Sequence, residues 1–244
     1  MRYVGGKGRI ANKIADVIRS NTQHGTVYEP FMGGGAMTAA LAPRFDEVIA
    51  GDAHEDIALM WAAVLGGWEP PVVTYDEYQE LRYSDDPSAL RGFAGSGCSF
   101  GGRWFGGFAR GGTSADGTPR NHQAESARAI LRDRDRMLSG AVSVFHKDYR
   151  AWPWDCVQPA AIYCDPPYSV SLDTKLYKEN TFDPVEFWDW ADQMAEVHDV
   201  FVSEYEAPDG WVPIWEGAKR QSLVVGSGNR DVRIERLFVK EVAE

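Results

Sequence analysis

Short apolar runs alternate with amphipathic stretches along most of the chain, and this pattern predicts strands that are followed by helices. The runs predicted as strands cover residues 26–29, 47–52, 141–145, 160–164 and 200–203. Helices are predicted for about 10–12 residues after Gly8, and over residues 36–41, 53–65, 122–138 and 183–197. Strands that alternate with helices in this way are typical of an α/β fold with a mainly parallel sheet.

The remaining patterned segments predict a hairpin and one further helix. Two β-rich runs, 221–225 and 232–239, flank Gly226-Ser227-Gly228-Asn229, which is a hairpin signal. Thr74 and Glu77 have the spacing of a capping box, so we expect a helix from there to about Tyr83. The hairpin would add antiparallel strands to the end of an otherwise parallel sheet.

Residues 95–117 have neither a helical nor a strand period. Glycines recur there between aromatic residues and arginines, namely Phe100, Arg103, Trp104, Phe105, Phe108 and Arg110. Ordering many glycines costs conformational entropy, so we expect a flexible loop that builds little core. Such a loop suits base stacking and phosphate contact. The alternative is a glycine-rich surface loop without a ligand.

A glycine-rich turn follows the first predicted strand. Gly33 and Gly35 fit the first two positions of the dinucleotide-binding pattern, whereas Thr38 holds the third. Asp52 lies 19 positions after Gly33, where this pattern places an acid that accepts from ribose hydroxyls. Two interpretations remain open. One is a site for an adenosine-containing cofactor, and the other is a structural turn with Asp52 as a helix N-cap three residues before Glu55.

Asp165-Pro166-Pro167-Tyr168 follows the buried strand predicted at 160–164. The prolines end this strand, because they lack a donor for the next ladder bond. In an open α/β sheet, ligands bind at the carboxyl ends of strands. There a carboxylate and a carbonyl can accept both N–H bonds of a nucleobase amino group, while Tyr168 stacks on the base, which contributes about 1–3 kcal/mol. The alternative is a strand-ending turn with an incidental Asp and Tyr.

Charge is distributed unevenly along the chain. The formal net charge of −11 over 244 residues argues against indiscriminate binding to nucleic acid. Residues 82–136, however, contain nine arginines against six acidic residues. A local basic element on an acidic protein can steer a polyanion. The alternative is a solvated surface with a chance enrichment of arginine.

Cysteine content and hydropathy indicate the expected compartment. Cys98, Cys156 and Cys164 are odd in number and widely spaced, which suits reduced thiols in the cytoplasm and predicts neither a disulfide framework nor a metal site. The sequence has no apolar run of about 18 residues, so we expect no transmembrane helix and no membrane partner. The first residues also lack the apolar core of a signal peptide.

Several separated motifs together resemble the Dam-type DNA N6-adenine methyltransferase family, the α-group of S-adenosylmethionine-dependent enzymes. The motifs are Tyr3-Val4-Gly5-Gly6-Lys7, Glu29-Pro30-Phe31-Met32-Gly33-Gly34-Gly35, Gly51-Asp52 and Asp165-Pro166-Pro167-Tyr168. Tyr3 stands where the family has Trp, and residues 228–230 and 235–237 are loosely similar to its C-terminal hairpin. Order and spacing agree over nearly the whole length.

This resemblance implies a Rossmann-like seven-stranded methyltransferase sheet, mostly parallel with an antiparallel C-terminal hairpin. Residues 1–66 and 140–244 would form the catalytic domain, and residues 67–139 a small inserted target-recognition region. The resemblance implies S-adenosylmethionine as cofactor. It would be bound by Tyr3, Gly6, Lys7, Glu29, Pro30, Phe31, Gly33, Gly35, Asp52, Asp148 and Asp165.

The activity that the resemblance implies is site-specific methylation of the exocyclic amino group of a flipped adenine in double-stranded DNA. Asp165, Pro166, Pro167 and Tyr168 would be catalytic, and Arg103, Trp104, Arg110 and Lys175 would contact DNA. If the enzyme belongs to a restriction-modification system, a cognate restriction nuclease is an expected partner. The protein itself is expected to be a monomer or a weak dimer. The alternatives are a related methyltransferase for RNA or another amino or amide nitrogen, and a catalytically inactive DNA-binding relative. The recognised DNA sequence stays open.

Overall fold

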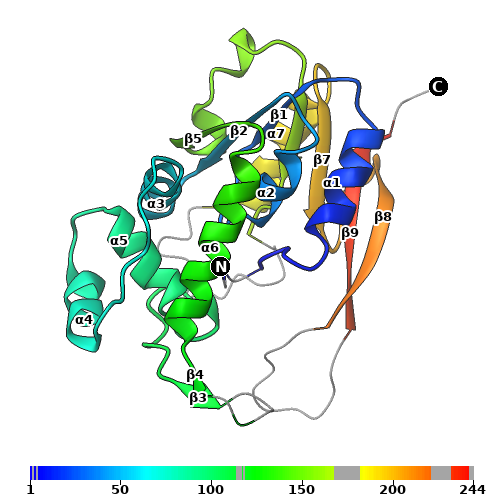
Figure 1. Ribbon diagram of the computed structural model, residues 1–244. Coiled ribbons are helices and arrows are strands. Elements are labelled where there is room, and N and C mark those ends of the chain that lie inside the picture. The colour runs from blue at the N-terminus through cyan, green and yellow to red at the C-terminus, as the bar shows by residue number, and fades with distance from the viewer. Residues whose placement is uncertain are drawn as a thin grey trace.

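The computed structural model describes residues 1, 3, 5–113, 117, 119–167, 182–220 and 232–241. In this part of the chain, seven strands form one sheet in the order β5-β2-β1-β6-β7-β9-β8 (Figure 1). The strands are β1 Thr26–Glu29, β2 Glu47–Asp52, β5 Ala141–His146, β6 Ala161–Cys164, β7 Asp199–Glu204, β8 Trp211–Arg220 and β9 Val232–Lys240. The first five in spatial order are parallel, and β9 is antiparallel to β7 and β8. The expected fold class is therefore confirmed.

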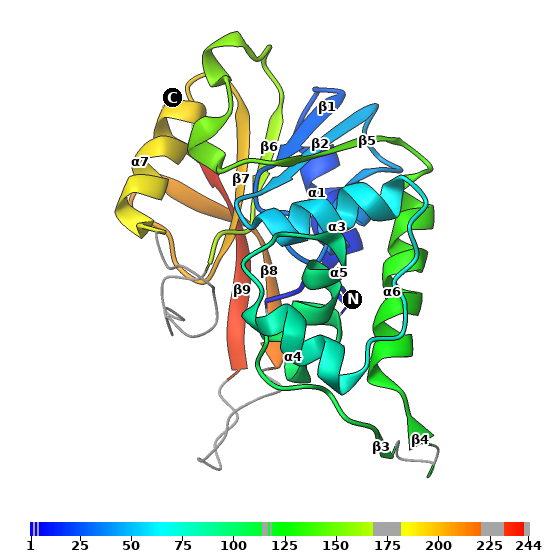
Figure 2. The same cartoon turned by 90° about the vertical axis from the view of Figure 1, so that its left-hand side faces the viewer.

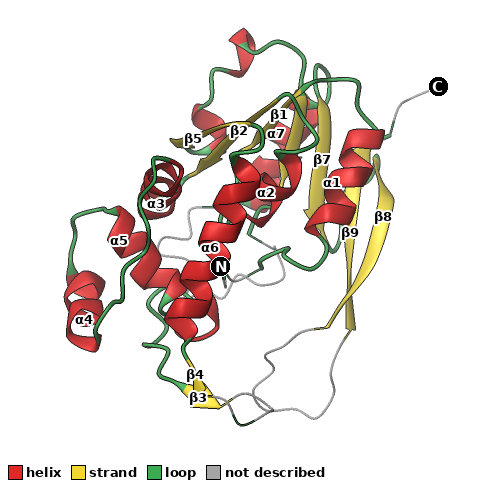
Figure 3. Cartoon of the chain, viewed as in Figure 1, coloured by secondary structure: helices red, strands yellow, loops and turns green. Residues whose placement is uncertain are grey.

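Helices cover both faces of this sheet (Figure 2). The longer ones are α1 Ala11–Ser20, α3 Glu55–Leu65, α4 Tyr75–Tyr83, α6 His122–Met137 and α7 Pro184–Met194, and the short ones are α2 Ala36–Leu41 and α5 Ala89–Gly92. Figure 3 distinguishes these helices from the strands and from a short ribbon, β3 Gly112–Thr113 with β4 Pro119–Arg120. Helices α1 and α2 lie on one face of the sheet, and α7 lies on the other.

The central strand β6 explains why an uninterrupted apolar run predicts a buried strand. Ala161 and Tyr163 pack into the cluster that contains α1 and α2, whereas Ile162 and Cys164 pack into the cluster that contains α7. All four residues are buried. A parallel strand with helices on both faces has no solvent side, so its sequence does not alternate.

The C-terminal antiparallel strands were only partly predicted. Strand β9 agrees with the expected run at 232–239, but its hairpin partner β8 was missed. The run expected at 221–225 lies outside the described residues. The β8 sequence contains Pro213 and has a register irregularity between Pro213 and Trp215. Strand β8 is at the edge of the sheet, where proline is tolerated. Because Pro213 and the irregularity interrupt the alternation of apolar and polar residues, the sequence pattern does not predict this strand.

Three details of the expected helices are wrong. The helices expected at 53–65 and 122–138 would bury the apolar residues Leu59 and Leu138, but these side chains are 37% and 59% exposed. The buried stripe of α3 runs through Ile57, Met60, Trp61 and Val64. Leu59 lies off that stripe, and Leu138 follows the last residue of α6 as its C-cap. Helix α7 ends at Met194, three residues before the expected end, and Val197 is exposed.

The first part of the glycine-rich region, residues 95–109, contributes to the core, contrary to the expectation of a flexible loop with little core, whereas residues 110–113 and 117 are exposed. Phe93 and Cys98 are fully buried, and Phe105 is nearly so. The glycines permit close packing, because a Cβ at Gly92 would lie 2.2 Å from the Asp56 carbonyl oxygen and one at Gly95 would lie 2.3 Å from the Trp104 ring. Glycine content therefore misleads here, since it reflects tight contacts between elements.

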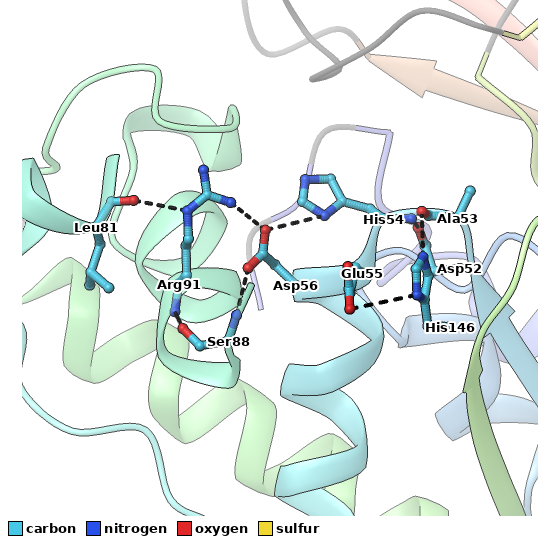
Figure 4. A network of polar contacts seen from close by, with 9 residues as sticks. All are labelled: Asp52, Ala53, His54, Glu55, Asp56, Leu81, Ser88, Arg91 and His146. Atoms are coloured by element: carbon cyan, nitrogen blue, oxygen red, sulfur yellow. Dashed lines mark hydrogen bonds and ion pairs between the residues drawn. The ribbon is translucent and has the colours of Figure 1, made fainter. Parts of the chain in front are cut away.

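A buried ion pair fixes this region to α3. The Asp56 carboxylate pairs with the Arg91 guanidinium and accepts a hydrogen bond from the Ser88 backbone N–H at 2.8 Å (Figure 4). Arg91 also donates to the Leu81 carbonyl at 2.9 Å. Helix α6 packs against α2 and α3. The expected division into a catalytic domain and an inserted region at 67–139 remains a prediction.

The capping box at the start of α4 is confirmed and gives a stability prediction. The Thr74 hydroxyl accepts from the Glu77 N–H at 3.2 Å, and the Glu77 carboxylate accepts from the Thr74 N–H at 2.7 Å. Thr74→Ala should lower the free energy of unfolding by about 1 kcal/mol, measured by urea denaturation. Glu80→Ala, exposed on the same helix, is the control. Equal stability of both variants would show that the cap contributes nothing.

The helices of the described residues include none that is long and apolar enough to span a membrane. Cys98, Cys156 and Cys164 are free thiols, and two of them are buried. Burial raises the pKa of the Cys98 thiol to about 12, so this side chain behaves as a core residue and not as a nucleophile.

Candidate active site

A cavity of about 380 Å³ opens at the carboxyl ends of the parallel strands. Its walls come from the N-terminal turn, the turn after β1, the ends of β2, β5 and β6, and the segment that contains Pro87, Ser96, Gly102 and Trp104. The residues predicted from sequence that line it are Tyr3, Gly6, Lys7, Glu29, Phe31, Gly33, Asp52, Trp104, Asp148, Asp165, Pro166 and Pro167. Residues from separate motifs therefore meet in one cavity.

Four predicted site residues within the described part of the chain are not found in the cavity wall. Pro30, Gly35, Arg103 and Arg110 are described but do not line it. Arg103 and Arg110 are exposed, and the Arg110 guanidinium lies 5.3 Å from the centre of the Tyr75 ring. Tyr168 and Lys175 lie outside the described residues, so their roles stay predictions.

The glycine turn between β1 and α2 is shaped by close packing on both sides. Gly33 and Gly35 adopt left-handed backbone angles, with φ of 44° and 72°. A Cβ at Gly33 would lie 2.7 Å from the Tyr3 ring, and one at Gly35 would lie 2.5 Å from the Trp61 ring. The Trp61 indole N–H also donates to the Gly33 carbonyl at 3.0 Å. Gly35 thus shapes the turn from behind, and Gly33 faces the cavity.

Asp52 at the end of β2 is held by two backbone hydrogen bonds. Its carboxylate accepts from the Gly33 N–H and from the His54 N–H, both at 2.8 Å. The N-cap of α3 is His54, so the alternative interpretation of Asp52 as this N-cap is wrong. Burial raises the pKa of Asp52 to about 6, although both hydrogen bonds oppose the shift. The carboxyl group is positioned to accept from a ligand hydroxyl.

Glu29 places a second carboxyl group in the cavity wall, at the end of β1. It is 1% exposed and accepts from the Thr38 hydroxyl at 2.7 Å. Burial raises its pKa well above the usual range, and the charges of Asp165 and Asp52 raise it further. A ligand with a positive charge would favour the ionised form of Glu29. The cavity therefore suits a cationic ligand.

Lys7 joins the N-terminal turn to β6 and β9. Its ammonium group lies 2.5 Å from the Asp165 carboxylate and 2.8 Å from the Glu235 carboxylate. Lys7 and Glu235 are buried, whereas the Asp165 side chain is 19% exposed. Burial lowers the pKa of Lys7, but the two carboxylates outweigh it and leave this pKa raised. Lys7 stays charged and holds Asp165 at the cavity.

Glu235 was not predicted as a site residue, although the sequence contains a signal for it. In the strand run at 232–239, Glu235 is two residues before Leu237 and therefore lies on the same strand face. Leu237 belongs to the apolar cluster beneath α1. An acid on the inward face of a strand is expensive to bury, so it predicts a buried cation as its partner.

Residues after β5 form a further part of the cavity wall. Arg150 forms a bidentate ion pair with Asp148, with N···O distances of 2.7 and 3.0 Å. Burial raises the pKa of Asp148, but hydrogen bonds from Arg150 outweigh it and leave this pKa lowered. Tyr149 packs on Phe31, and its buried hydroxyl has no hydrogen-bond partner among the described residues. This hydroxyl is a polar group available to a ligand.

Comparison with known proteins finds one family model that is similar to part of the chain. Residues 3–87 match the model of the D12 class N6 adenine-specific DNA methyltransferases. No curated protein matches the sequence significantly.

Solved structures with a similar fold are distant in sequence. The rRNA methyltransferase aviRa from Streptomyces viridochromogenes has 15% identity and a TM-score of 0.44, over 95% of this chain and 84% of that one. A putative RNA methyltransferase from Pyrococcus horikoshii has 11% identity and a TM-score of 0.42, over 95% and 82%. A putative methylase from Haemophilus influenzae has 10% identity and a TM-score of 0.41, over 96% and 89%.

The family match covers the parts of the chain that build one side of the cavity. Lys7, Glu29, the glycine turn and Asp52 all lie within residues 3–87 and line the cavity. Asp165, which comes later in the chain, is joined to this segment by its ion pair with Lys7. The chain is therefore a methyltransferase with S-adenosylmethionine as its methyl donor, and its residues 3–87 are similar to the D12 class N6 adenine-specific DNA methyltransferases.

Proposed function

We propose that this protein is a site-specific DNA methyltransferase that methylates the exocyclic amino group of adenine. The observation that carries the proposal is the position of Asp165-Pro166 at the end of β6. There Lys7 of the family-matched segment fixes the Asp165 carboxylate at the wall of the cavity. A charged acceptor and the cavity for a methyl donor thus occur together.

The cavity fits S-adenosylmethionine in charge and in polar groups. Bound S-adenosylmethionine supplies an electrophilic methyl group on a sulfonium, whose sulfur keeps the bonding electrons when the methyl group leaves. Asp52 would accept from the ribose hydroxyls. Glu29 would face the positively charged amino acid end, because a buried carboxylate needs a cation beside it. Phe31 and Tyr149 supply an aromatic wall.

Asp165 and the Pro166 carbonyl are the acceptors proposed for the target amino group. The lone pair of such an amino group is delocalised into the ring, so the group is a poor nucleophile. Two acceptors on its N–H bonds turn the lone pair toward the methyl carbon and help to remove the proton released on transfer. Tyr168 is proposed to stack on the base. The base must leave the duplex to reach this cavity.

The type of polymer is tested by offering DNA and RNA in parallel. Wild-type protein is incubated with radiolabelled S-adenosylmethionine and either duplex DNA or RNA of the same sequence. We expect label in the DNA alone. Label in RNA alone would overturn the DNA assignment and favour a related RNA methyltransferase. Binding of DNA with no label and no cofactor binding would identify an inactive DNA-binding relative.

The affinity for S-adenosylmethionine should fall as the pH drops below about 6. Burial raises the pKa of Asp52 to about 6, and its ionised form is the better acceptor for ribose hydroxyls. Cofactor binding should therefore favour the ionised form and release protons near this pH. The dissociation constant should rise by up to about tenfold per pH unit below the pKa of Asp52. Calorimetry in buffers of different ionisation enthalpy measures both quantities.

Asp52→Asn separates this effect from that of Glu29, whose pKa is also raised. The variant should bind the cofactor more weakly, and the part of the pH dependence near pH 6 should disappear. A wild-type affinity that is constant between about pH 5 and pH 8, with no proton release, would contradict the role of Asp52.

A further inference from the structure

Two aromatic side chains meet in the cavity wall beside α3. His54 and Trp104 both line the cavity, and their ring centres are 4.1 Å apart. The His54 backbone N–H donates to Asp52, so this pair lies next to the acid proposed for the ribose. His54 is the N-cap of α3, whereas Trp104 comes from the region predicted to be inserted. The inserted region therefore forms part of the cavity wall.

The Trp104 ring is held in place from behind. The Arg91 guanidinium lies 5.4 Å from the centre of this ring, and the Phe105 ring packs against it at 5.0 Å. The backbone of Gly95 supports the ring closely enough that a Cβ there would be 2.3 Å away. Arg91 is in turn fixed by Asp56 (Figure 4). A ligand that stacks on Trp104 would lose little binding free energy to ordering this side chain, because the ring is already fixed.

The order of strands decides which ligand ring this wall can reach. Asp52 is the last residue of β2, and Asp165 directly follows the last residue of β6. Strand β1 lies between these two strands in the sheet. Adjacent strands are about 4.8 Å apart, so the two strand ends are separated by about 10 Å. The target base belongs at Asp165. The ring closest to the ribose acid Asp52 is the purine of the cofactor.

We propose that Trp104 is a cofactor-binding residue, whose ring covers the adenine of S-adenosylmethionine together with His54. This inference rests on the cofactor and not on the identity of the methylated polymer. It reassigns Trp104, which the sequence predicted as a DNA contact. Phe100 and Arg103 of the same region are exposed and do not line the cavity, so they stay candidates for DNA. One short segment would then serve both ligands.

The test measures cofactor binding without nucleic acid. Trp104→Ala should weaken binding of S-adenosylmethionine and of S-adenosylhomocysteine roughly 5- to 150-fold, which corresponds to the loss of one stacking contact. Adenosine alone should lose the same factor, because the lost contact is with the base. Trp104→Phe should restore most of the affinity. Phe100→Ala is the matched control, since this side chain is 62% exposed, and its cofactor affinity should equal that of wild type.

Two results would overturn the proposal. One is an unchanged cofactor affinity in Trp104→Ala together with weaker DNA binding, which would return Trp104 to the DNA interface. The other is equal loss of affinity in Trp104→Ala and Phe100→Ala. If Trp104→Ala does not fold, His54→Ala carries the test, and an unchanged adenosine affinity in that variant would overturn the proposal. If the methylated polymer is not DNA, the expected cofactor and adenosine affinities of these variants stay the same.

Discussion

Asp165→Asn should lower the rate of methyl transfer by about 10²- to 10⁴-fold, the range expected when a positioned acid–base group is lost. Asparagine keeps the size of the side chain but replaces one acceptor oxygen with an NH₂ group. Lys7, 2.5 Å from the Asp165 carboxylate, will attract the remaining oxygen. The NH₂ group would then face the N–H bonds of the target amine, so two donors would oppose each other.

The binding of cofactor should survive this substitution, because Glu29 and Asp52 remain. Single-turnover kinetics with saturating cofactor measure the transfer step, and calorimetry measures cofactor affinity. Asp189→Asn, an exposed change on α7, is the matched control. A rate within a factor of about three of wild type would refute the catalytic role of Asp165. Equal loss of transfer and of cofactor affinity would point to a structural role instead.

Lys7→Met should lower the free energy of unfolding by about 3–5 kcal/mol, the usual cost of removing one partner from a buried ion pair. Asp165 and Glu235 would then lie close together without the cation between them. The two carboxyl groups would bind protons more tightly in the folded state than in the unfolded state. The difference in stability between wild type and Lys7→Met should therefore shrink as the pH falls.

Lys240→Met is the matched control for this result. Lys240 pairs with Asp192 at 2.6 Å, but both side chains are partly exposed, so its loss should cost at most about 1 kcal/mol. Adding Glu235→Gln to Lys7→Met should recover part of the lost stability, because it removes one of the two negative charges that Lys7 neutralises. Equal costs for Lys7→Met and Lys240→Met, measured by urea denaturation, would contradict the account of the buried network.

The strands and helices that build the cavity could be predicted because their signals are local. Strands β1 and β2 and helix α2 have the expected bounds, since each is a short apolar run beside glycine, proline or acidic residues. The same local signals placed Asp52 and Asp165 at strand ends. They could not show that Lys7 contacts Asp165, which lies 158 residues away in the sequence.

What the sequence did not reveal depends on contacts between distant elements. Glu235 becomes a site residue only because β9 lies in the sheet next to β7 and brings its carboxylate to Lys7. The composition around Gly95 predicts a flexible loop, because composition alone does not show that the missing side chain of Gly95 leaves room for the Trp104 ring. Trp104 could be recognised from the sequence as an aromatic candidate for ligand contact, but its place in the cavity wall depends on Arg91 and Asp56.

The identity of the methylated nucleoside tests the central claim most directly. Unmethylated duplex DNA is incubated with wild-type protein and S-adenosylmethionine, digested to nucleosides and examined by mass spectrometry. The account predicts N6-methyldeoxyadenosine, confined to one sequence context and absent with Asp165→Asn. A methylated cytosine as the product, or no methylated nucleoside from protein that binds the cofactor, would contradict it.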